Sequence, residues 1–330
     1  MLSEQVDRKL LQLRKFKEGQ VRGELYEAED EYEVTMFKDV LPIDSTSRSW
    51  GGYEMKYPDG EEATDWTNLH GLVDFVANAD ALVFREEIGE RFDMANAIDY
   101  FIFVNLIRAT DNTGKNIYVA RYEEDAPYFY VPWNLGGSWG LQGDGELMDV
   151  TDDMLLNGLY QKLLGLNAQE FRERLSQRWK ALRGSVLSDE AIATLISEAQ
   201  ATLLGNNVYE REARAWKEYT YDPASIDYLN SWITRRLTYL DEYFNDPVLS
   251  TEGPAQQERV ILYPNPANHT LTVPITSHHP MPYQLINIHG VVVQSGTLSA
   301  DDPTIDVTRL QRGYYILRAE DIAERVLVTD

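Results

Sequence analysis

The sequence predicts an α+β protein with two parts: a mostly helical domain with a short β insert, and a small all-β sandwich at the C-terminus. Three observations support this prediction. Residues 66–245 place apolar side chains at helical spacings, residues 246–257 form a linker of Pro, Gly, Ser and Gln, and residues 258–330 are short alternating segments. Turn signals that recur about every ten residues in the last part are typical of an immunoglobulin-like sandwich.

The helical domain, residues 1–245, can be followed element by element. Asp93 is a candidate N-cap for a helix whose apolar stripe has spacings of three and four. The stripe consists of Met94, Ile98, Phe101, Ile102, Asn105 and Leu106. The β insert follows at residues 116–122 and 128–133, which alternate and are rich in aromatics. Further helices are expected at residues 155–166, 168–182, 189–204, 208–219 and 223–244, the last opening on Pro223 in its first turn.

The composition restricts the class of partner. The chain contains 54 acidic and 30 basic side chains and has a formal net charge of -24. This charge opposes nucleic acid binding, because phosphates are repelled at long range. Only eight acids and five arginines lie in residues 256–330, so the acidity belongs to the helical domain. The absence of cysteine excludes disulfides and thiolate chemistry, and no apolar run reaches the roughly 20 residues of a transmembrane segment.

The C-terminal part contains an ordered series of motifs. It opens with YPNP at residues 263–266, where two prolines end a strand. The later motifs are IHGVVV at 288–293, IDV at 305–307, LQRGYYIL at 310–317 and RVLV at 325–328. Expected strands lie at residues 260–263, 270–275, 283–288, 291–297, 305–307, 314–318 and 325–328. By composition alone, an ordinary β-sandwich without any chemistry is equally consistent.

In this order, the motifs resemble the C-terminal sorting domain of proteins exported by the type IX secretion system of Bacteroidetes. The resemblance implies that residues 258–330 engage the type IX secretion machinery. It also implies that the protein is secreted or held at the outer cell surface, with or without later removal of this domain.

Two segments of the helical domain are candidates for chemistry. DNTGKN at residues 111–116 places Asn116 five residues after Asp111, the spacing of the protein-kinase catalytic loop. A simple polar turn is the alternative, because Asn-Thr-Gly is typical turn composition. VPWNLGGSWG at residues 131–140 follows the predicted strand, where a phosphotransferase is expected to hold a magnesium-binding carboxylate. The alternative for this segment is a glycine-rich turn between two core tryptophans.

Together, the segments NAIDYF, ATDNTGKNIY and PWNLGGSWG resemble the CotH kinase family, with similarity from about residue 53 to residue 244. The resemblance implies an atypical-kinase-like fold that transfers phosphate from ATP to protein hydroxyls with magnesium. By the match, Asp111 is the expected catalytic residue, and Lys115 and Asn116 are expected to bind the cofactor. Asn116 and Asn134 are the expected metal ligands.

The second segment departs from the family pattern Trp-Asp-x-Asp. Asn134 and Gly136 stand where the pattern has two carboxylates, so neither position supplies negative charge. Asp144, Glu146 and Asp149 are candidates to compensate. We expect weak or absent ATP turnover, because phosphoryl transfer depends on charge neutralisation. Three functions stay open: an impaired secreted kinase, a pseudokinase that serves as a surface binding or adhesion module, and a carbohydrate-associated surface protein.

The N-terminal region is a second departure. Family members have an N-terminal lobe in which segments with Arg and Lys contact the nucleotide phosphates. Most of this lobe is expected to precede Met1, and only residues 23–27 resemble the strand that closes it. Residues 1–20 also lack the apolar core of an export signal, which proteins with the sorting domain carry. We therefore expect an N-terminally incomplete chain, either a fragment or a misassigned start.

Other candidate sites are weaker. The acidic residues between 27 and 33 could bind calcium, but a solvated face is favoured because EF-hand spacing is lacking. His70 is expected to be a surface or capping group rather than a base. The four tail histidines, His269, His278, His279 and His289, match no metal-ligand pattern. Several aromatics could stack on sugars, but most are expected in the core: Trp50, Tyr53, Trp66, Trp133 and Trp139.

Overall fold

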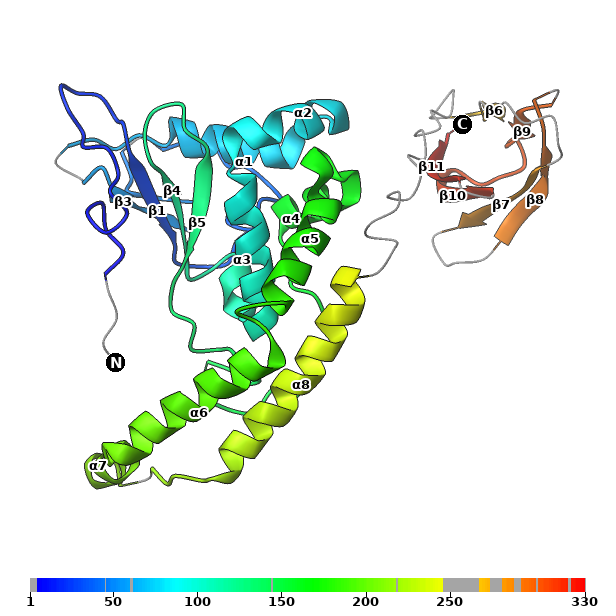
Figure 1. Ribbon diagram of the computed structural model, residues 1–330. Helices are drawn as coiled ribbons and strands as arrows, with labels where there is room; N and C mark the ends of the chain where they lie inside the picture. Colours follow the sequence, from blue (N-terminus) through cyan, green and yellow to red (C-terminus); the bar gives the residue numbers. More distant parts are fainter. Residues whose placement is uncertain are drawn as a thin grey trace. The chain divides into compact units, whose positions relative to one another are not determined.

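The structure is a computed structural model that describes residues 5–44, 46–59, 62–143, 145–217, 219–245, 267–273, 281–287, 292–300, 302–319 and 322–329. The chain forms two compact units, Met1–Gly253 and Pro254–Asp330. The first combines a five-stranded sheet with helices, and the second is built from strands (Figure 1). The predicted α+β class with a separate all-β part is therefore confirmed.

The sheet of the first unit has the strand order β2-β3-β1-β4-β5, with every neighbouring pair antiparallel. The strands are β1 Glu24–Ala28, β2 Ser49–Trp50, β3 Tyr53–Tyr57, β4 Ile117–Arg121 and β5 Tyr128–Pro132. The predicted insert corresponds to β4 and β5, but it is no isolated hairpin, because β4 also pairs with β1. Strands β2 and β3 were not expected from the sequence.

Both faces of this sheet are covered. Tyr26 of β1 packs in the main core with the helices, whereas its neighbour Leu25 packs against Val6 and Leu13 of the N-terminal segment. Successive side chains of a strand point to opposite faces, so β1 is buried on both sides. The face covered by the N-terminal segment is called the outer face below.

The helices after residue 93 follow the predicted order, and two further helices precede them in a stretch that was predicted only as mostly helical. The first three are α1 Thr67–Asn78, α2 Ala81–Arg91 and α3 Met94–Ile107. Asp93 caps α3 as predicted, since its Oδ1 accepts hydrogen bonds from the backbone N–H groups of Ala95 (2.8 Å) and Asn96 (3.1 Å). The remaining helices are, in chain order, α4 Gly158–Leu166, the short 3-10 helix η2 Ala168–Glu170, α5 Phe171–Arg183, α6 Asp189–Gly205, α7 Val208–Ala215 and α8 Ala224–Asn245.

Several helix boundaries differ from the prediction. Helix α5 begins at Phe171 rather than at residue 168, because residues 168–170 form the short helix η2. Helix α4 begins at Gly158 rather than at residue 155, because the Asn157 side chain caps it by accepting a hydrogen bond from Tyr160 N–H at 3.2 Å. Helix α7 ends at Ala215 rather than at residue 219, because the chain becomes extended at Trp216. Among the described residues, no helix is both long and apolar enough to cross a bilayer.

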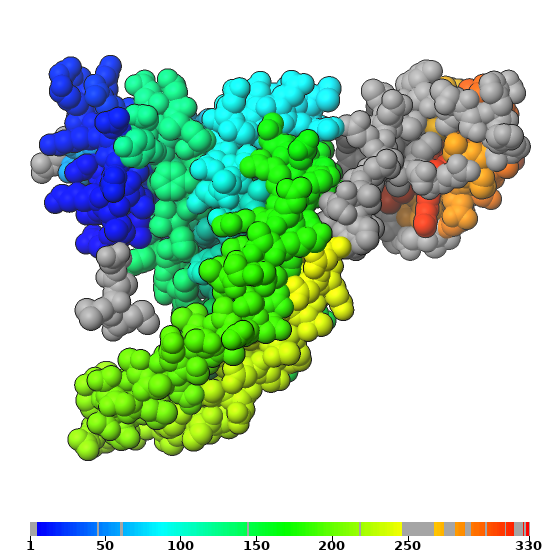
Figure 2. Space-filling view, in the orientation of Figure 1, coloured from blue at the N-terminus to red at the C-terminus, as the bar shows by residue number. Residues whose placement is uncertain are grey.

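Helices α6 and α7 and the first half of α8 project from the rest of the first unit as an arm (Figures 1 and 2). Within α6 only Ile192 is buried, and α7 has no buried residue. Helix α8 buries side chains only from Trp232 onward, which anchors it on the core. The arm thus leaves much of its helical surface without intramolecular cover.

The second unit has a four-stranded sheet in the order β11-β10-β7-β8 and a two-stranded sheet of β6 and β9. The strands are β6 Thr270–Thr272, β7 Met281–Asn287, β8 Val292–Leu298, β9 Thr304–Asp306, β10 Gly313–Ala319 and β11 Ile322–Val328. Leu271, Leu285, Ile305 and Leu317 form part of a single apolar core. The predicted strand at 260–263, the YPNP motif and the histidines at 278, 279 and 289 lie outside the described residues.

Candidate functional site

The structure brings the two predicted segments to one end of the five-stranded sheet. Asp111 lies in the short helix η1 Thr110–Thr113 after α3, Asn116 precedes β4, and Asn134 follows β5. Because β4 and β5 are neighbours, the Trp133 backbone N–H donates to the Asn116 carbonyl at 3.1 Å. The Asn134 Nδ2 atom then lies 3.5 Å from Asn116 Oδ1. The two expected metal ligands are therefore adjacent.

Asn112, which the sequence analysis did not select, fixes this arrangement. Its side chain is 1% exposed, and Nδ2 donates to the carbonyls of Asn116 (2.8 Å) and Trp133 (2.7 Å). The Tyr100 hydroxyl of α3 donates to the Asn112 carbonyl at 2.9 Å. One buried amide thus ties the loop to the start of β4 and the end of β5. Asp111 beside it is exposed.

A layer of buried tyrosines supports the loop from below. The rings of Tyr100 and Tyr130 are 4.7 Å apart, and the Asn157 amide donates to the Tyr130 hydroxyl at 3.1 Å. Asn157 Nδ2 also donates to the Thr113 carbonyl at 3.0 Å. Burial raises the pKa of Tyr100 and Tyr130 above the ordinary value of a phenol. These hydroxyls hold the loop and stay protonated at neutral pH.

The residues at the expected metal positions do not fit a magnesium site. Asn116 and Asn134 contribute neutral amides, whereas magnesium in proteins is usually bound through one or two carboxylates plus substrate phosphates. Gly136 has no side chain, although a Cβ there would have only Asn134 Oδ1 nearby, at 3.7 Å. Of the acids expected to compensate, Asp149 forms an ion pair with Arg235 of α8, and residue 144 lies outside the described residues.

A cluster of charges lies on the outer face of the sheet. Carboxylate oxygens of Glu27, Glu29 and Glu54 lie within 4.8 Å of one another. The Lys56 ammonium lies among them, 2.9 Å from Glu27 and 3.4 Å from Glu29, and also pairs with Glu54. The Tyr118 hydroxyl donates to Glu27 at 3.1 Å. Glu27 and Glu29 of the acidic run thus share one lysine with Glu54. The other acids of the run, Asp30, Glu31 and Glu33, are exposed, as the solvated face predicts.

The pKa shifts in this cluster have separable causes. Burial lowers the pKa of Lys56, but hydrogen bonds with Glu54 and Glu27 outweigh it, and the net pKa is raised. The hydrogen bond with Glu54 raises the pKa of Glu29, and the same contact lowers the pKa of Glu54. The ammonium therefore stays charged and lies among three carboxylates, so the cluster is acidic even with the lysine in place.

A pocket with a volume of ≈ 420 Å³ adjoins this cluster under the N-terminal segment. Its cationic lining consists of Arg8, Lys9, Lys15 and Lys56, and its acidic lining of Asp7, Asp59 and Glu62. Tyr118 also lines the pocket, and its ring packs edge-on against Trp133 at 5.8 Å. The pocket is therefore connected through two aromatic rings to the segment that carries Asn134.

The aromatics considered for sugar stacking are mostly in the core. Trp50, Tyr53 and Trp66 are at most 4% exposed, as the sequence analysis expected. His70 packs against Trp50 with ring centroids 5.5 Å apart, in a structural role. Lys115 lies in the same loop as Asp111 and is half-buried.

Comparisons with known proteins give two family matches. Residues 1–240 match the CotH kinase protein family, and residues 261–328 match the secretion system C-terminal sorting domain. A search of curated proteins gives no match.

Two solved structures show local similarity. The first is described as AaCel9A in complex with cellobiose-like isofagomine, with 24% identity, a TM-score of 0.17 and coverage of 19% of this chain and 12% of that chain. The second is a single-mutant thermostable endoglucanase from Alicyclobacillus acidocaldarius, with 22% identity, a TM-score of 0.18 and coverage of 22% and 15%. These TM-scores are too low to indicate a shared fold. The match over residues 1–240, by contrast, spans most of the sequence, and the chain belongs to the CotH kinase protein family, with a secretion-system sorting domain after it.

Proposed function

We propose that this protein is a secreted CotH-family pseudokinase, which serves as a binding or adhesion module at the cell surface. The observation that carries the proposal is the contact between Asn116 and Asn134, with Gly136 beside it. Asn134 and Gly136 occupy the two positions where the family pattern has metal-binding carboxylates, and Asn116, the other expected ligand, is also neutral.

The physical argument concerns charge. Phosphoryl transfer is catalysed almost entirely by positioning and by neutralising the charge of the phosphates. A magnesium ion at this site would have to be held by uncharged amide oxygens alone. Loss of both carboxylates is expected to lower the rate by orders of magnitude, which leaves the fold available for binding without catalysis.

An impaired kinase is the second candidate, and specific features favour it. Asp111 is exposed in its loop, where it could accept the proton of a substrate hydroxyl. Lys115 and Asn116 are the proposed cofactor-binding residues of the same loop. Arg8, Lys9 and Lys15, which line the pocket under the N-terminal segment, could contact the phosphates of ATP. In this alternative, residual transfer would depend on Asp111.

Calorimetry on the full chain separates the two candidates. ATP is titrated with and without magnesium into the natural protein and into Asp111→Ala, and transfer to a generic protein acceptor is followed with labelled ATP. The pseudokinase predicts no magnesium-dependent heat and no transfer above that of Asp111→Ala. Magnesium-dependent transfer that disappears in Asp111→Ala would overturn it and favour the impaired kinase.

Secretion rests on the sorting domain. A domain of this family indicates secretion to the cell surface or outside, and we assign contact with the type IX machinery to residues 258–330. In a host with this secretion system, a truncated protein that lacks residues 258–330 is expected to stay in the periplasm. Equal surface display of the truncated and natural proteins, measured by protease accessibility on intact cells, would contradict the assignment.

A further inference from the structure

One face of α8 holds the chain that continues from the candidate site. Tyr228, Trp232 and Arg236 are spaced four residues apart, so they lie on the same face of the helix. All three donate hydrogen bonds to backbone carbonyls between Gly140 and Asp153. The arm is thus attached to the glycine-rich segment, residues 134–143, and to the chain that follows it.

The inner end of this face is fixed by a buried charge. Arg236 is fully buried, and its guanidinium donates to the carbonyls of Asn105 (2.8 Å), Thr151 (2.9 Å) and Asp153 (2.7 Å). Burial lowers the pKa of Arg236 to about 10, so the group is still charged at neutral pH. Removing the partners of a buried charge is strongly destabilising. Arg236 is therefore the point at which α8 is held most firmly.

The outer end of the same face meets Gly140. The Tyr228 hydroxyl donates to the Gly140 carbonyl at 2.8 Å, and Trp232 Nε1 donates to the Val150 carbonyl at 3.2 Å. The approach is close, because a Cβ at Gly140 would lie 2.7 Å from Trp232 Cδ1 and 2.8 Å from the Tyr228 hydroxyl oxygen. Any side chain at position 140 would therefore displace either α8 or the glycine-rich segment.

The Gly140 carbonyl joins three parts of the structure. It accepts a hydrogen bond from the Met148 backbone N–H at 2.7 Å in addition to that from Tyr228, so it also closes the loop between residues 140 and 148. Gly136 lies four residues before Gly140 in the chain, and Asn134 lies six residues before it. A short stretch of chain thus connects the contact with the arm to the family's metal positions.

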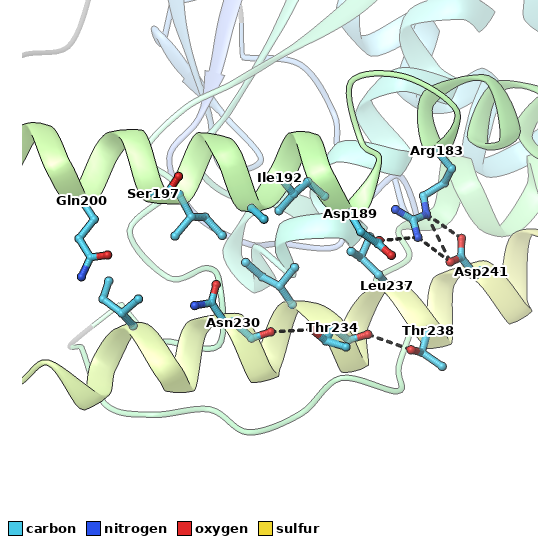
Figure 3. A pocket seen from close by; sticks show the side chains of 14 residues that line it. Arg183, Asp189, Ile192, Ser197, Gln200, Asn230, Thr234, Leu237, Thr238 and Asp241 are labelled. Carbon is cyan, nitrogen blue, oxygen red and sulfur yellow. Dashed lines mark hydrogen bonds and ion pairs between the residues drawn. The ribbon is translucent and has the colours of Figure 1, made fainter.

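The outer half of α8 has little other support. Helices α6 and α8 face one another across a groove of ≈ 490 Å³ (Figure 3). They are tied together only at the base of the arm, where Arg183 pairs with Asp189 of α6 at 2.8 Å and with Asp241 of α8 at 3.0 Å (Figure 3). Residues 224–231 of α8, all described by the structure, include no buried side chain. Their position therefore depends strongly on the contact between Tyr228 and Gly140.

We propose that the arm controls the mobility of the glycine-rich segment. Displacement of the outer half of α8 opens the contact between Tyr228 and Gly140 first, because Arg236 holds the inner half. The segment then loses its support from α8 and becomes more mobile next to Asn134. The coupling is reciprocal, because each side of a shared contact stabilises the other. It does not rest on nucleotide binding and applies to a pseudokinase and to a kinase alike.

Hydrogen exchange of the full chain, measured by mass spectrometry without nucleotide, tests the coupling from the side of the arm. Three amides of the segment are hydrogen-bonded and report its opening: Trp139, Leu141 and Gln142. Tyr228→Phe removes one hydroxyl and is expected to speed exchange in residues 134–143 at least about threefold. Tyr209→Phe is the matched control, because Tyr209 lies in α7 and stacks on Tyr221 instead, with ring centroids 4.0 Å apart. It should change this exchange less than about twofold.

Two results would overturn the proposal at this stage. The first is exchange in residues 134–143 that is the same in Tyr228→Phe as in the natural protein. The second is equal acceleration in α3, because it would show a loss of stability throughout the unit rather than a local release of the segment.

Two glycines test the coupling from the side of the segment. Gly140 and Gly145 both have left-handed backbone conformations, with φ of 81° and 88°, so alanine is strained at either position. Only Gly140 contacts α8, since a Cβ at Gly145 would meet no atom within 4 Å. We expect Gly140→Ala to speed exchange in residues 224–231 at least about tenfold and Gly145→Ala to change it less than about twofold. Equal effects of the two substitutions on α8 would contradict the coupling.

A double variant shows whether both substitutions act through the same contact. Gly140→Ala already separates α8 from the segment, so adding Tyr228→Phe should change exchange in residues 134–143 by less than about twofold. If the two effects multiply instead, Tyr228 and Gly140 act independently and the proposal is wrong.

Discussion

Asn134 and Asn116 lie with their side-chain amides 3.5 Å apart, and both residues adopt left-handed backbone conformations, with φ of 46° and 55°. Asparagine and aspartate tolerate this conformation better than other residues with side chains. The backbone of the site is therefore compatible with the carboxylate that the family pattern places at Asn134. The two amides differ from a metal site in charge more than in shape.

Restoring the carboxylates should restore affinity for the metal–nucleotide pair. We expect Asn134→Asp combined with Gly136→Asp to produce magnesium-dependent ATP binding in calorimetry, because two charges return and a Cβ at Gly136 meets only Asn134 Oδ1, at 3.7 Å. Asn134→Gln combined with Gly136→Ala is the control, since it changes shape without adding charge. A double aspartate variant that stays folded and binds no nucleotide would show that another part of the site prevents ATP binding.

The buried Asn112 amide should matter more for stability than the neighbouring Asp111. Asn112→Ala leaves the carbonyls of Asn116 and Trp133 without their donor, and we expect a loss of about 3 kcal/mol in the free energy of unfolding. Asp111→Ala alters an exposed side chain and should cost less than about 0.5 kcal/mol. Urea unfolding followed by tryptophan fluorescence measures both. Similar losses in the two variants would contradict the role given to Asn112.

Glu24 is fully buried and binds three groups. Its carboxylate accepts hydrogen bonds from Arg121 Nη2 (2.7 Å), from Asn68 Nδ2 (2.6 Å) and from the Tyr128 hydroxyl. Glu24→Leu would leave the Arg121 charge buried without a partner, and we expect a loss of about 3–5 kcal/mol. Glu24→Gln keeps the shape and should cost less. Denaturant unfolding in which the two variants are equally destabilised would argue against a charge effect.

Acid should weaken the contact between Asp153 and Arg108. Burial raises the pKa of Asp153, but two hydrogen bonds from Arg108, at 2.7 and 2.8 Å, outweigh this effect. The net pKa of Asp153 is therefore lower than the ordinary aspartate value of 3.8. A carboxyl whose pKa is lower in the folded than in the unfolded protein stabilises the fold. That stabilisation is fully present above the pKa of the unfolded state and is lost as the pH falls through the pKa of the folded state. We expect Asp153→Asn to lower stability at neutral pH and to reduce its dependence on pH below about 4.

The matched control for this pH dependence is Asp99, which forms an exposed pair with Arg178 at 2.7 Å. Asp99 and Arg178 are 49% and 46% exposed, whereas Asp153 and Arg108 are 39% and 9% exposed. Screening should therefore weaken the first pair more. Thermal unfolding at several pH values compares Asp99→Asn with Asp153→Asn. A larger effect of Asp99→Asn would contradict the assignment.

Local signals account for the parts of the fold that were predicted correctly. The stripe of α3 and its Asp93 cap depend on residues within one or two turns, so periodicity and capping chemistry identify them. The hairpin of β4 and β5 likewise follows from two alternating segments joined by a short turn. The adjacency of Asn116 and Asn134 was anticipated through motif resemblance rather than through spacing alone.

The remaining features depend on contacts between distant residues. Lys56 meets Glu27 because β1 and β3 are neighbours, and nothing in the sequence periodicity of either strand specifies that pairing. The role of Asn112 likewise depends on Trp133 arriving beside it at the end of β5. The sequence by itself determined the helices from α3 onward, the two-part organisation and the absence of charge at the family's metal positions, because these are local properties. Tertiary structure decided which side chains are neighbours, because strand order and helix packing are settled by burial over the whole unit.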